Sequence, residues 1–156
     1  MHLSNCLISR LNIKFFISFA LIFFSISIFA QTAEPRYPIN NDRVSPNPKF
    51  TALASSLVAG VTYNIVISEQ PRGGEANQYI DFWTKEGVPA SSLMDTNLNR
   101  LGWDSTWVRK TRNGSYTGTA VVLPNATPAS LTNGKTYYWH IYGSNGTKST
   151  ENTFAI

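Results

Sequence analysis

The sequence predicts a mainly β fold in which two antiparallel sheets pack face to face. Apolar and polar residues alternate with a period of two over residues 60–68 and 136–142, a pattern typical of strands with one face in a core. Three Asn-Gly pairs, which favour tight turns between strands, stand at Asn113-Gly114, Asn133-Gly134 and Asn145-Gly146. The length beyond residue 30 suits one domain with its own core.

Residues 1–30 have the order of a secretory signal peptide. A tail with Arg10 and Lys14 and no acidic residue precedes an apolar run that closes on Ala30. Cleavage is expected after Ala30. The alternative is an uncleaved anchor, although the run is shorter than the ~20 apolar residues of a membrane-spanning helix. The protein is therefore expected to be secreted or to lie at the cell surface or in the periplasm, with no stable membrane span after cleavage.

Export also changes the charge and the metal chemistry that are expected of the mature chain. Without Arg10 and Lys14, eleven basic residues face nine acidic ones, so the basic pI is weak support for a nucleic-acid partner. Cys6 and His2 leave as well, so that no cysteine remains and His140 is the single histidine. A disulfide framework and a Cys/His zinc site are excluded, and no cofactor or metal is expected.

The N-terminal part of the mature chain is rich in proline. Because proline cannot donate to a strand ladder, residues 31–37 are predicted to be a linker leading into an edge strand, and the domain covers residues 38–156. Residues 60–68 are predicted to form a strand whose inward-facing side chains are Val61, Tyr63, Ile65 and Ile67.

The segment 69–105 is predicted to be an insertion that carries a helix over residues 75–86. Tyr79, Ile80 and Trp83 follow helical spacing, and Gly87 comes where a C-terminal cap is favoured. A second short helix within residues 89–101 is a weaker prediction, since Thr96, Asn97 and Asn99 are poor helix formers.

The period of two returns after residue 105. Residues 107–123 are predicted to form a hairpin around Asn113-Gly114, and residues 149–156 a last strand. Between them, alternation within residues 131–143 places one set of side chains in the core: Tyr137, Trp139 and Ile141. The opposite set is expected to be exposed, the alternative being that the inserted helix covers it: Tyr138, His140 and Tyr142.

Short motifs resemble fibronectin type III and related bacterial Ig-like modules. Leu131, Gly134 and Tyr137 match the corner between the E and F strands, where a tyrosine hydroxyl bonds to nearby backbone. The phrase over residues 136–141 is similar to the F strand, and residues 38–44, 48–50, 62–65 and 153–156 are similar to the A, B, C and G strands. The resemblance covers about half of the mature chain.

This resemblance implies a β-sandwich whose usual roles are binding, spacing or adhesion, although a fold alone does not give a function. Two features depart from the family pattern. Ala52 stands where a B-strand tryptophan is expected, so that Trp139 is the candidate to fill that volume. The segment 69–105 is longer than such modules usually have.

Catalytic and metal chemistry find little support in the sequence. His140 lies in the middle of a strand and no Gly-x-Ser-x-Gly motif exists, which argues against a hydrolytic triad. Four acids in segment 69–105 could in principle serve a glycosidase, but surface acids explain them as well: Asp81, Glu86, Asp95 and Asp104. Asp95-x-Asn97-x-Asn99 is only a partial calcium loop, because Arg100 replaces the required glycine.

The aromatic residues indicate a possible ligand more clearly, because there are more of them than one small sandwich core needs. Flat rings beside polar side chains suit the face of a sugar, while core packing is the alternative for each ring. Arg109, Lys110 and Arg112 could meet an anionic polysaccharide or a phosphate-rich surface, or could simply keep the hairpin soluble. The candidate ligand-binding residues are Tyr138, His140, Tyr142, Trp83, Trp103, Arg109 and Arg112.

The sequence thus predicts a non-catalytic extracellular binding or adhesion module, with carbohydrate as the candidate ligand. Its partner would be a polysaccharide or a surface protein, and not nucleic acid. The alternative is a structural subunit of a cell-surface assembly that docks through a strand edge.

Overall fold

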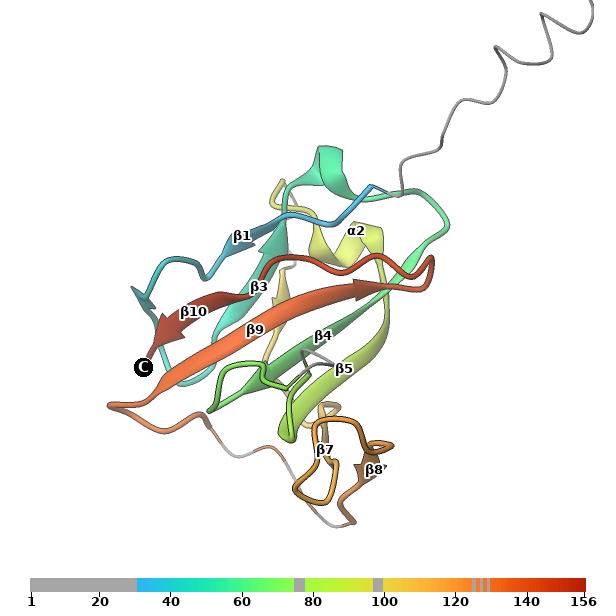
Figure 1. Ribbon diagram of the computed structural model, residues 1–156. Helices are drawn as coiled ribbons and strands as arrows, with labels where there is room; N and C mark the ends of the chain where they lie inside the picture. Colours follow the sequence, from blue (N-terminus) through green and yellow to red (C-terminus); the bar gives the residue numbers. More distant parts are fainter. Residues whose placement is uncertain (1–30, 75–77, 97–99, 125, 127, 129) are drawn as a thin grey trace, which may run out of the picture.

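Two β-sheets of unequal size pack around an aromatic core (Figure 1). The computed structural model describes residues 31–156 except 75–77, 97–99, 125, 127 and 129. The predicted signal peptide therefore lies outside the described residues. The smaller sheet has the strand order β1-β3-β6, and the larger one has the order β2-β10-β9-β4-β5-β7-β8. The predicted mainly β architecture with two packed sheets is confirmed.

The smaller sheet contains β1 (Pro35–Tyr37), β3 (Lys49–Ala52) and β6 (Leu101–Gly102). The larger sheet contains β2 (Asp42–Arg43), β4 (Thr62–Ser68), β5 (Asp81–Pro89), β7 (Val108–Thr111), β8 (Val121–Val122), β9 (Thr136–Gly143) and β10 (Asn152–Ala155). Two short helical segments lie between strands: η1 (Ala54–Ser56) and α2 (Ala90–Leu93). Strand β2 pairs in parallel with β10, and β9 pairs antiparallel with both β10 and β4.

Strands β4 and β9 form the centre of the larger sheet, as the alternation predicts. Ile65 lies opposite Ile141, and Ile67 lies opposite Trp139. These four side chains and Tyr137 are buried in the core between the sheets. Because side chains on a strand point to alternate faces, this register places the predicted set inward and its neighbours on the outer face.

Each central strand is entered through a tyrosine corner. The Tyr137 hydroxyl accepts a hydrogen bond from the Thr132 amide at 2.9 Å, as the family resemblance implies. The Tyr63 hydroxyl accepts an equivalent bond from the Val58 amide at 2.8 Å. Both corners share the pattern Leu-x-x-Gly-x-Thr-Tyr, and their glycines have φ of +77° and +78°. The corner at Tyr63 was missed in the sequence, although its spacing repeats that of Tyr137.

The predicted helix over residues 75–86 is wrong. Residues 81–86 belong to β5, which pairs with β4 on one side and β7 on the other, while residues 75–77 lie outside the described residues. Phe82 and Thr84 are buried on one face and Trp83 packs against the core on the other. Since both faces are covered, the apolar spacing comes from burial on two sides rather than from a helical stripe.

Segment 69–105 is accordingly part of both sheets and not an insertion. It supplies β5 to the larger sheet and β6 to the smaller one, with the single turn of α2 between them. This turn is what remains of the second helix expected within residues 89–101, and its Leu93 is fully buried.

The predicted linker is also partly a strand. Pro35–Tyr37 form β1, which pairs with β3 at the edge of the smaller sheet, a position that tolerates proline. The chain then passes Pro38 and joins the larger sheet as β2. The Trp139 indole donates a buried hydrogen bond of 2.7 Å to the Pro38 carbonyl, so the core side chain also anchors this crossing.

Aromatic side chains fill the space between the sheets. The Phe50 ring lies 5.2 Å from Trp139, 5.4 Å from Trp107 and 6.0 Å from Phe154, centroid to centroid. Trp139 is fully buried and belongs to the same core cluster as Ala52. Such tilted and edge-on contacts are the favoured arrangements of aromatic pairs.

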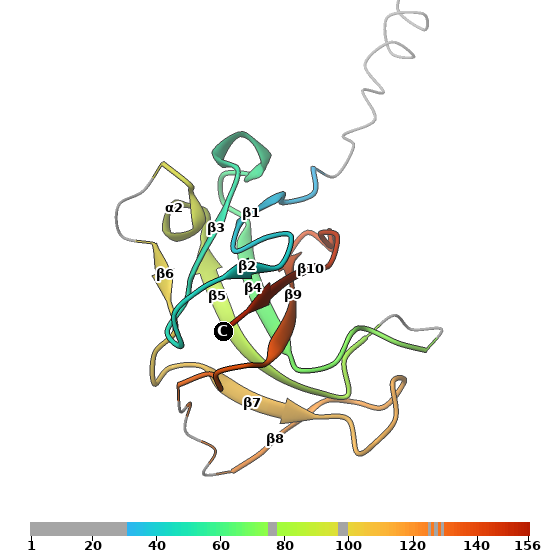
Figure 2. The ribbon, with the colours of Figure 1, turned by 90° about the vertical axis from the view of Figure 1, so that its left-hand side faces the viewer.

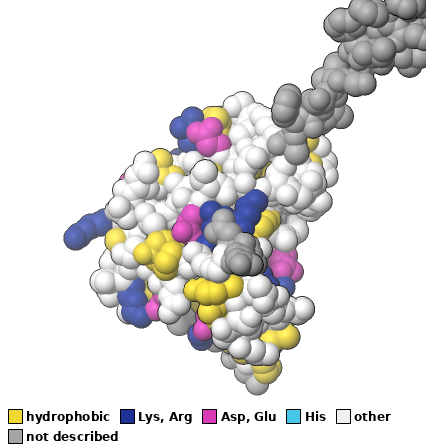
Figure 3. All heavy atoms as spheres, in the orientation of Figure 1, with side chains coloured by type: hydrophobic (Ala, Val, Ile, Leu, Met, Phe, Trp, Pro, Cys, Tyr) yellow, Lys and Arg dark blue, Asp and Glu magenta, His cyan; other side chains and the backbone are white. Residues whose placement is uncertain are grey.

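The outer face of the larger sheet carries a second buried cluster, which corrects the expected exposure of His140. Tyr79 of the β4–β5 connection packs over this face and stacks on His140, and Val66, Tyr79 and Phe82 are buried there. His140 is 0% exposed, and Tyr138 and Tyr142 are only half-buried. Figure 3 shows the molecule in the orientation of Figure 1, and no histidine is visible among its coloured atoms. Basic and acidic side chains lie side by side near the middle of this view.

Candidate functional site

The four tryptophans differ sharply in exposure. Trp139 is 0%, Trp107 2% and Trp103 8% exposed, whereas Trp83 is only partly buried. Trp103 and Trp107 lie 4.8 Å apart, and Trp83 stands edge-on to Trp103 at 5.6 Å. The three rings thus form a row that begins in the core and ends at Trp83. Trp83 is the tryptophan that can offer a ring face to a ligand.

Trp83 stands in a hollow of about 390 Å³ on the inner side of the larger sheet. The hollow exists because the smaller sheet is too narrow to cover all of the larger one. Figure 2 shows β7 and β8 at the end of the larger sheet that lies away from β1 and β3. Buried Ile67, Leu131 and Tyr137 complete its apolar lining. A volume of this size lies within the range of roughly 300–1,000 Å³ that is usual for small-molecule sites.

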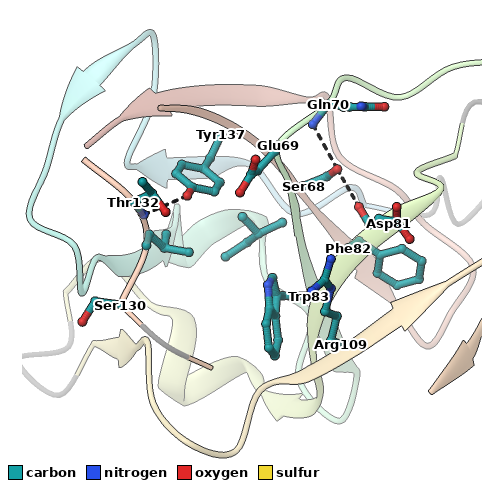
Figure 4. Close-up of a pocket in the computed structure, with 12 residues that line it drawn as sticks. Ser68, Glu69, Gln70, Asp81, Phe82, Trp83, Arg109, Ser130, Thr132 and Tyr137 are labelled. Atoms are coloured by element: carbon teal, nitrogen blue, oxygen red, sulfur yellow. Dashed lines mark hydrogen bonds between the residues drawn. The ribbon is translucent and has the colours of Figure 1, made fainter. Parts of the chain in front are cut away.

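Trp83 and Arg109 are brought together by strand pairing. They are directly opposite each other in the β5–β7 register, and the Arg109 guanidinium carbon lies 5.9 Å from the Trp83 ring centroid. Figure 4 shows Arg109 on one side of the ring, with Ser130 and Thr132 across the hollow on its other side. The ring therefore has one side that faces the hollow.

Polar groups surround this ring. Ser68, Glu69, Gln70, Asp81, Ser130 and Thr132 line the hollow with Arg109. The Ser68 hydroxyl donates to the Asp81 carbonyl at 2.7 Å and accepts from the Gln70 amide at 3.1 Å (Figure 4). These bonds tie together the two ends of the β4–β5 connection at the rim of the hollow.

The charges at the rim are unequally compensated. Lys135 Nζ lies 2.5 Å from the Glu69 carboxylate, and this contact raises the pKa of the Lys135 ammonium. Within the described residues, Arg109 has no carboxylate at ion-pair distance. Its guanidinium is therefore the basic group in the hollow that keeps its charge available for a ligand.

The other predicted site residues lie on the opposite face of the sheet. Tyr138, His140 and Tyr142 belong to the outer cluster, where the His140 ring stacks on Tyr79 at 5.0 Å and meets the Tyr142 ring edge-on at 4.3 Å. Tyr142 donates a hydrogen bond of 2.7 Å to Gln78. The seven predicted residues thus form two groups separated by the sheet, and the outer group is largely covered.

The His140 ring is buried, and its two nitrogens lack hydrogen bonds to the described residues. Burial lowers the pKa of His140 to about 2, and the cations Arg72 and Lys148 act in the same direction. Burial, together with the nearby Glu151 carboxylate, raises the pKa of Tyr79 above its ordinary value. His140 is therefore neutral in the folded protein, and its place in the cluster makes it a packing residue.

The two other basic residues of the hairpin are engaged elsewhere. Lys110 Nζ lies 2.5 Å from the Glu86 carboxylate. Arg112 donates to the carbonyls of Tyr79 and Gly118 at 2.9 Å each, and its guanidinium lies over the Phe82 ring. The predicted basic cluster is thus divided, with Arg109 alone on the side of the hollow.

The acids considered for catalysis are dispersed. Glu86 pairs with Lys110, Asp95 accepts from the Ala54 amide at 3.1 Å, and Asp81 lies at the rim of the hollow. Asp104 accepts from Thr106 and Lys85, and these bonds outweigh slight burial and lower its pKa. In the described part of the chain, no three His, Cys, Asp or Glu side chains are grouped as metal ligands would be. Asn97 and Asn99 of the partial calcium loop lie outside the described residues.

Several residues of the hollow were not identified in the sequence. Tyr137 and Ile67 were assigned to the core, while Glu69, Gln70 and Ser130 lie in loops without a motif. Thr132 lies within the tyrosine corner, whose pattern leaves that position free. The one available signal was the polar run Ser68-Glu69-Gln70 directly after an apolar strand. Loops at strand ends are where binding residues concentrate.

No helix of the described residues is long and apolar enough to cross a membrane. Comparison of the chain with protein-family models, with curated proteins and with solved structures found no match.

Proposed function

We propose that this chain is a non-catalytic extracellular binding module of the fibronectin type III or Ig-like type, and that its hollow holds one sugar unit of a polysaccharide. The main support is the exposure of Trp83. It is the one of the four tryptophans that is partly exposed, and it lies in a hollow with a polar rim. A sugar ring presents C–H groups to an aromatic face and hydroxyls to polar side chains around it. Trp83 supplies the first kind of contact, and the rim residues supply the second.

The strand order supports the sandwich type. Strand β9 lies between β4 and β10, as strand F lies between C and G in Ig-like sandwiches, and β1 pairs with β3 as A pairs with B. The tyrosine corner at Tyr137 is a further feature of such sandwiches. On this assignment β5, β7 and β8 extend the sheet beyond strand C, and this extension creates the hollow.

The test is calorimetric titration of the protein with a panel of oligosaccharides. Trp83→Leu keeps an apolar side chain against Trp103 but removes the flat ring, so we expect it to weaken binding at least tenfold. Tyr138→Leu is the matched control, because it removes a half-buried ring from the outer face. Absence of binding to every sugar, or equal affinity of the Trp83→Leu variant, would overturn the proposal.

A second function is favoured by the edge of the larger sheet. Val108, Val121 and Val122 are exposed there, and Val122 is 56% exposed. Among the described residues, strand β8 has a neighbour on one side only, and such an edge can pair with an extended segment of another chain. Concentration-dependent association that Val122→Lys abolishes, together with no sugar binding, would favour this docking function. The partner would then be a surface protein.

A further inference from the structure

We propose that the hollow selects an acidic sugar, a hexuronic acid unit whose ring lies on Trp83 and whose carboxylate is bound by Arg109. This inference rests on the proposed sugar-binding function and adds the chemical class of the sugar. It follows from the charge of Arg109, which no ion pair compensates among the described residues, and from the position of its guanidinium against the Trp83 ring.

Among the described residues, the hairpin places one guanidinium without an ion pair on the inner face of the sheet, and it lies over the Trp83 ring. Lys110 is neutralised by Glu86, and it lies opposite Phe82 in the β5–β7 register, on the outer face. Arg112 is held by two backbone carbonyls on the same outer side. Arg109 has neither kind of partner among the described residues, and its side chain is exposed.

The acids of the hollow do not cancel this charge. The Glu69 carboxylate is already compensated by Lys135 at 2.5 Å. Asp81 forms no ion pair with Arg109, and in Figure 4 its side chain points away from the Trp83 ring. An incoming anion therefore meets one guanidinium without an ion pair, one carboxylate that is already paired with Lys135, and the Asp81 carboxylate, which is directed away from the Trp83 ring. Opposite charge at that point favours an acidic ligand over a neutral one.

The guanidinium lies at the right place for a substituent of a stacked ring. Its carbon lies over the Trp83 ring at 5.9 Å from the centroid, which is a cation–π contact, on the side of the ring away from Ser130 and Thr132. The carboxylate of a hexuronic acid extends one bond beyond the sugar ring, so that a sugar on the hollow side of Trp83 would direct it past the indole toward the guanidinium on the other side. Arginine is suited to this contact because its planar fork can donate two parallel hydrogen bonds to a carboxylate.

The experiment compares acidic oligosaccharides with chemically reduced forms of themselves. Oligomers of galacturonic, mannuronic and glucuronic acid are titrated into the full protein by calorimetry, beside the same oligomers with each carboxylate reduced to an alcohol. At least one acidic oligomer should bind tenfold or more tightly than its reduced form, and added salt should weaken that binding, because charge pairs are screened.

Matched variants separate this inference from the function on which it rests. Arg109→Gln should lower the affinity for the acidic form to that for the reduced form, so that the tenfold preference is lost. Lys110→Gln removes the same charge one residue away on the outer face and should leave both affinities within twofold. Trp83→Leu should weaken both forms.

Equal affinity for acidic and reduced oligomers, or an acid preference that persists in Arg109→Gln, would refute the acidic-sugar inference and leave sugar binding standing. Absence of binding to every acidic, reduced and neutral oligomer would refute both. Tight binding of acetate or inorganic sulfate alone, with no added affinity from a sugar ring, would identify the hollow as a simple anion site and refute the inference as well.

Discussion

Replacing His140 by phenylalanine should remove a pH-dependent loss of stability. The imidazole is 0% exposed, and its two nitrogens have no hydrogen-bond partner among the described residues. It lies against the rings of Tyr79 and Tyr142, and the positive charges of Arg72 and Lys148 face it. A proton on this ring is therefore tolerated in the unfolded chain and strongly disfavoured in the folded one.

The direction of the effect follows from the two pKa values of His140. The pKa is about 2 in the folded protein and roughly 6.5 in an unfolded chain. Between these values the unfolded state binds a proton that the folded state does not, so the free energy of unfolding falls as the pH decreases. The slope is about 1.4 kcal/mol per pH unit, which makes the loss about 2 kcal/mol between pH 6.5 and pH 5.

The assay is urea unfolding, followed by tryptophan fluorescence, at pH 7.5, 6 and 5. Carboxylates titrate alike in the native and His140→Phe proteins, so the difference between the two stabilities isolates His140. We expect the two to lie within about 1.5 kcal/mol at pH 7.5, because the phenyl ring has nearly the shape of the imidazole. Between pH 7.5 and pH 5, the free energy of unfolding of the variant should rise by about 2 kcal/mol relative to that of the native protein. Parallel pH curves for the two proteins would refute the reasoning.

Three further predictions concern the stability of the core and its corners. Tyr137→Phe and Tyr63→Phe should each cost about 1–2 kcal/mol in urea unfolding, because each leaves a backbone amide without its hydroxyl partner; a loss near zero would show that water replaces the bond. Gly134→Ala should cost about 1–2 kcal/mol through its positive φ alone, since a Cβ there meets no atom within 4 Å, and Gly134→Asn should cost less. Trp139→Phe should lower stability by about 2–4 kcal/mol, because it removes the hydrogen bond to the Pro38 carbonyl and leaves a cavity; an unchanged midpoint in thermal unfolding would contradict that packing.

The centre of the fold was predictable from the sequence because its pattern and its environment agree. Tyr137, Trp139 and Ile141 alternate with polar-tipped residues, and in the structure they face the core. The glycine and tyrosine of the corner before β9 have fixed spacing, and the structure has the hydrogen bond that the spacing implies. Local rules sufficed where one face of a strand is buried and the turn is short.

Strand β5 and the outer face were not predictable for a shared reason. Whether Trp83 belongs to a helix or to a strand depends on partners in β4 and β7 that are distant in sequence. A ring with a polar edge, such as Tyr142 or His140, fits an exposed face and a covered one equally well, and only the path of the β4–β5 connection decides. Of the candidate site, Trp83 and Arg109 were found by composition, whereas their meeting across two strands required the structure.

The row of Trp83, Trp103 and Trp107 gives the molecule a built-in optical reporter. Indoles with centroids 4.8–5.6 Å apart couple electronically and exchange excitation energy, so they absorb and emit as a unit. A ligand that stacks on Trp83 should therefore change the near-ultraviolet circular dichroism and the fluorescence emission of all three tryptophans. Occupancy could thus be followed without any attached dye.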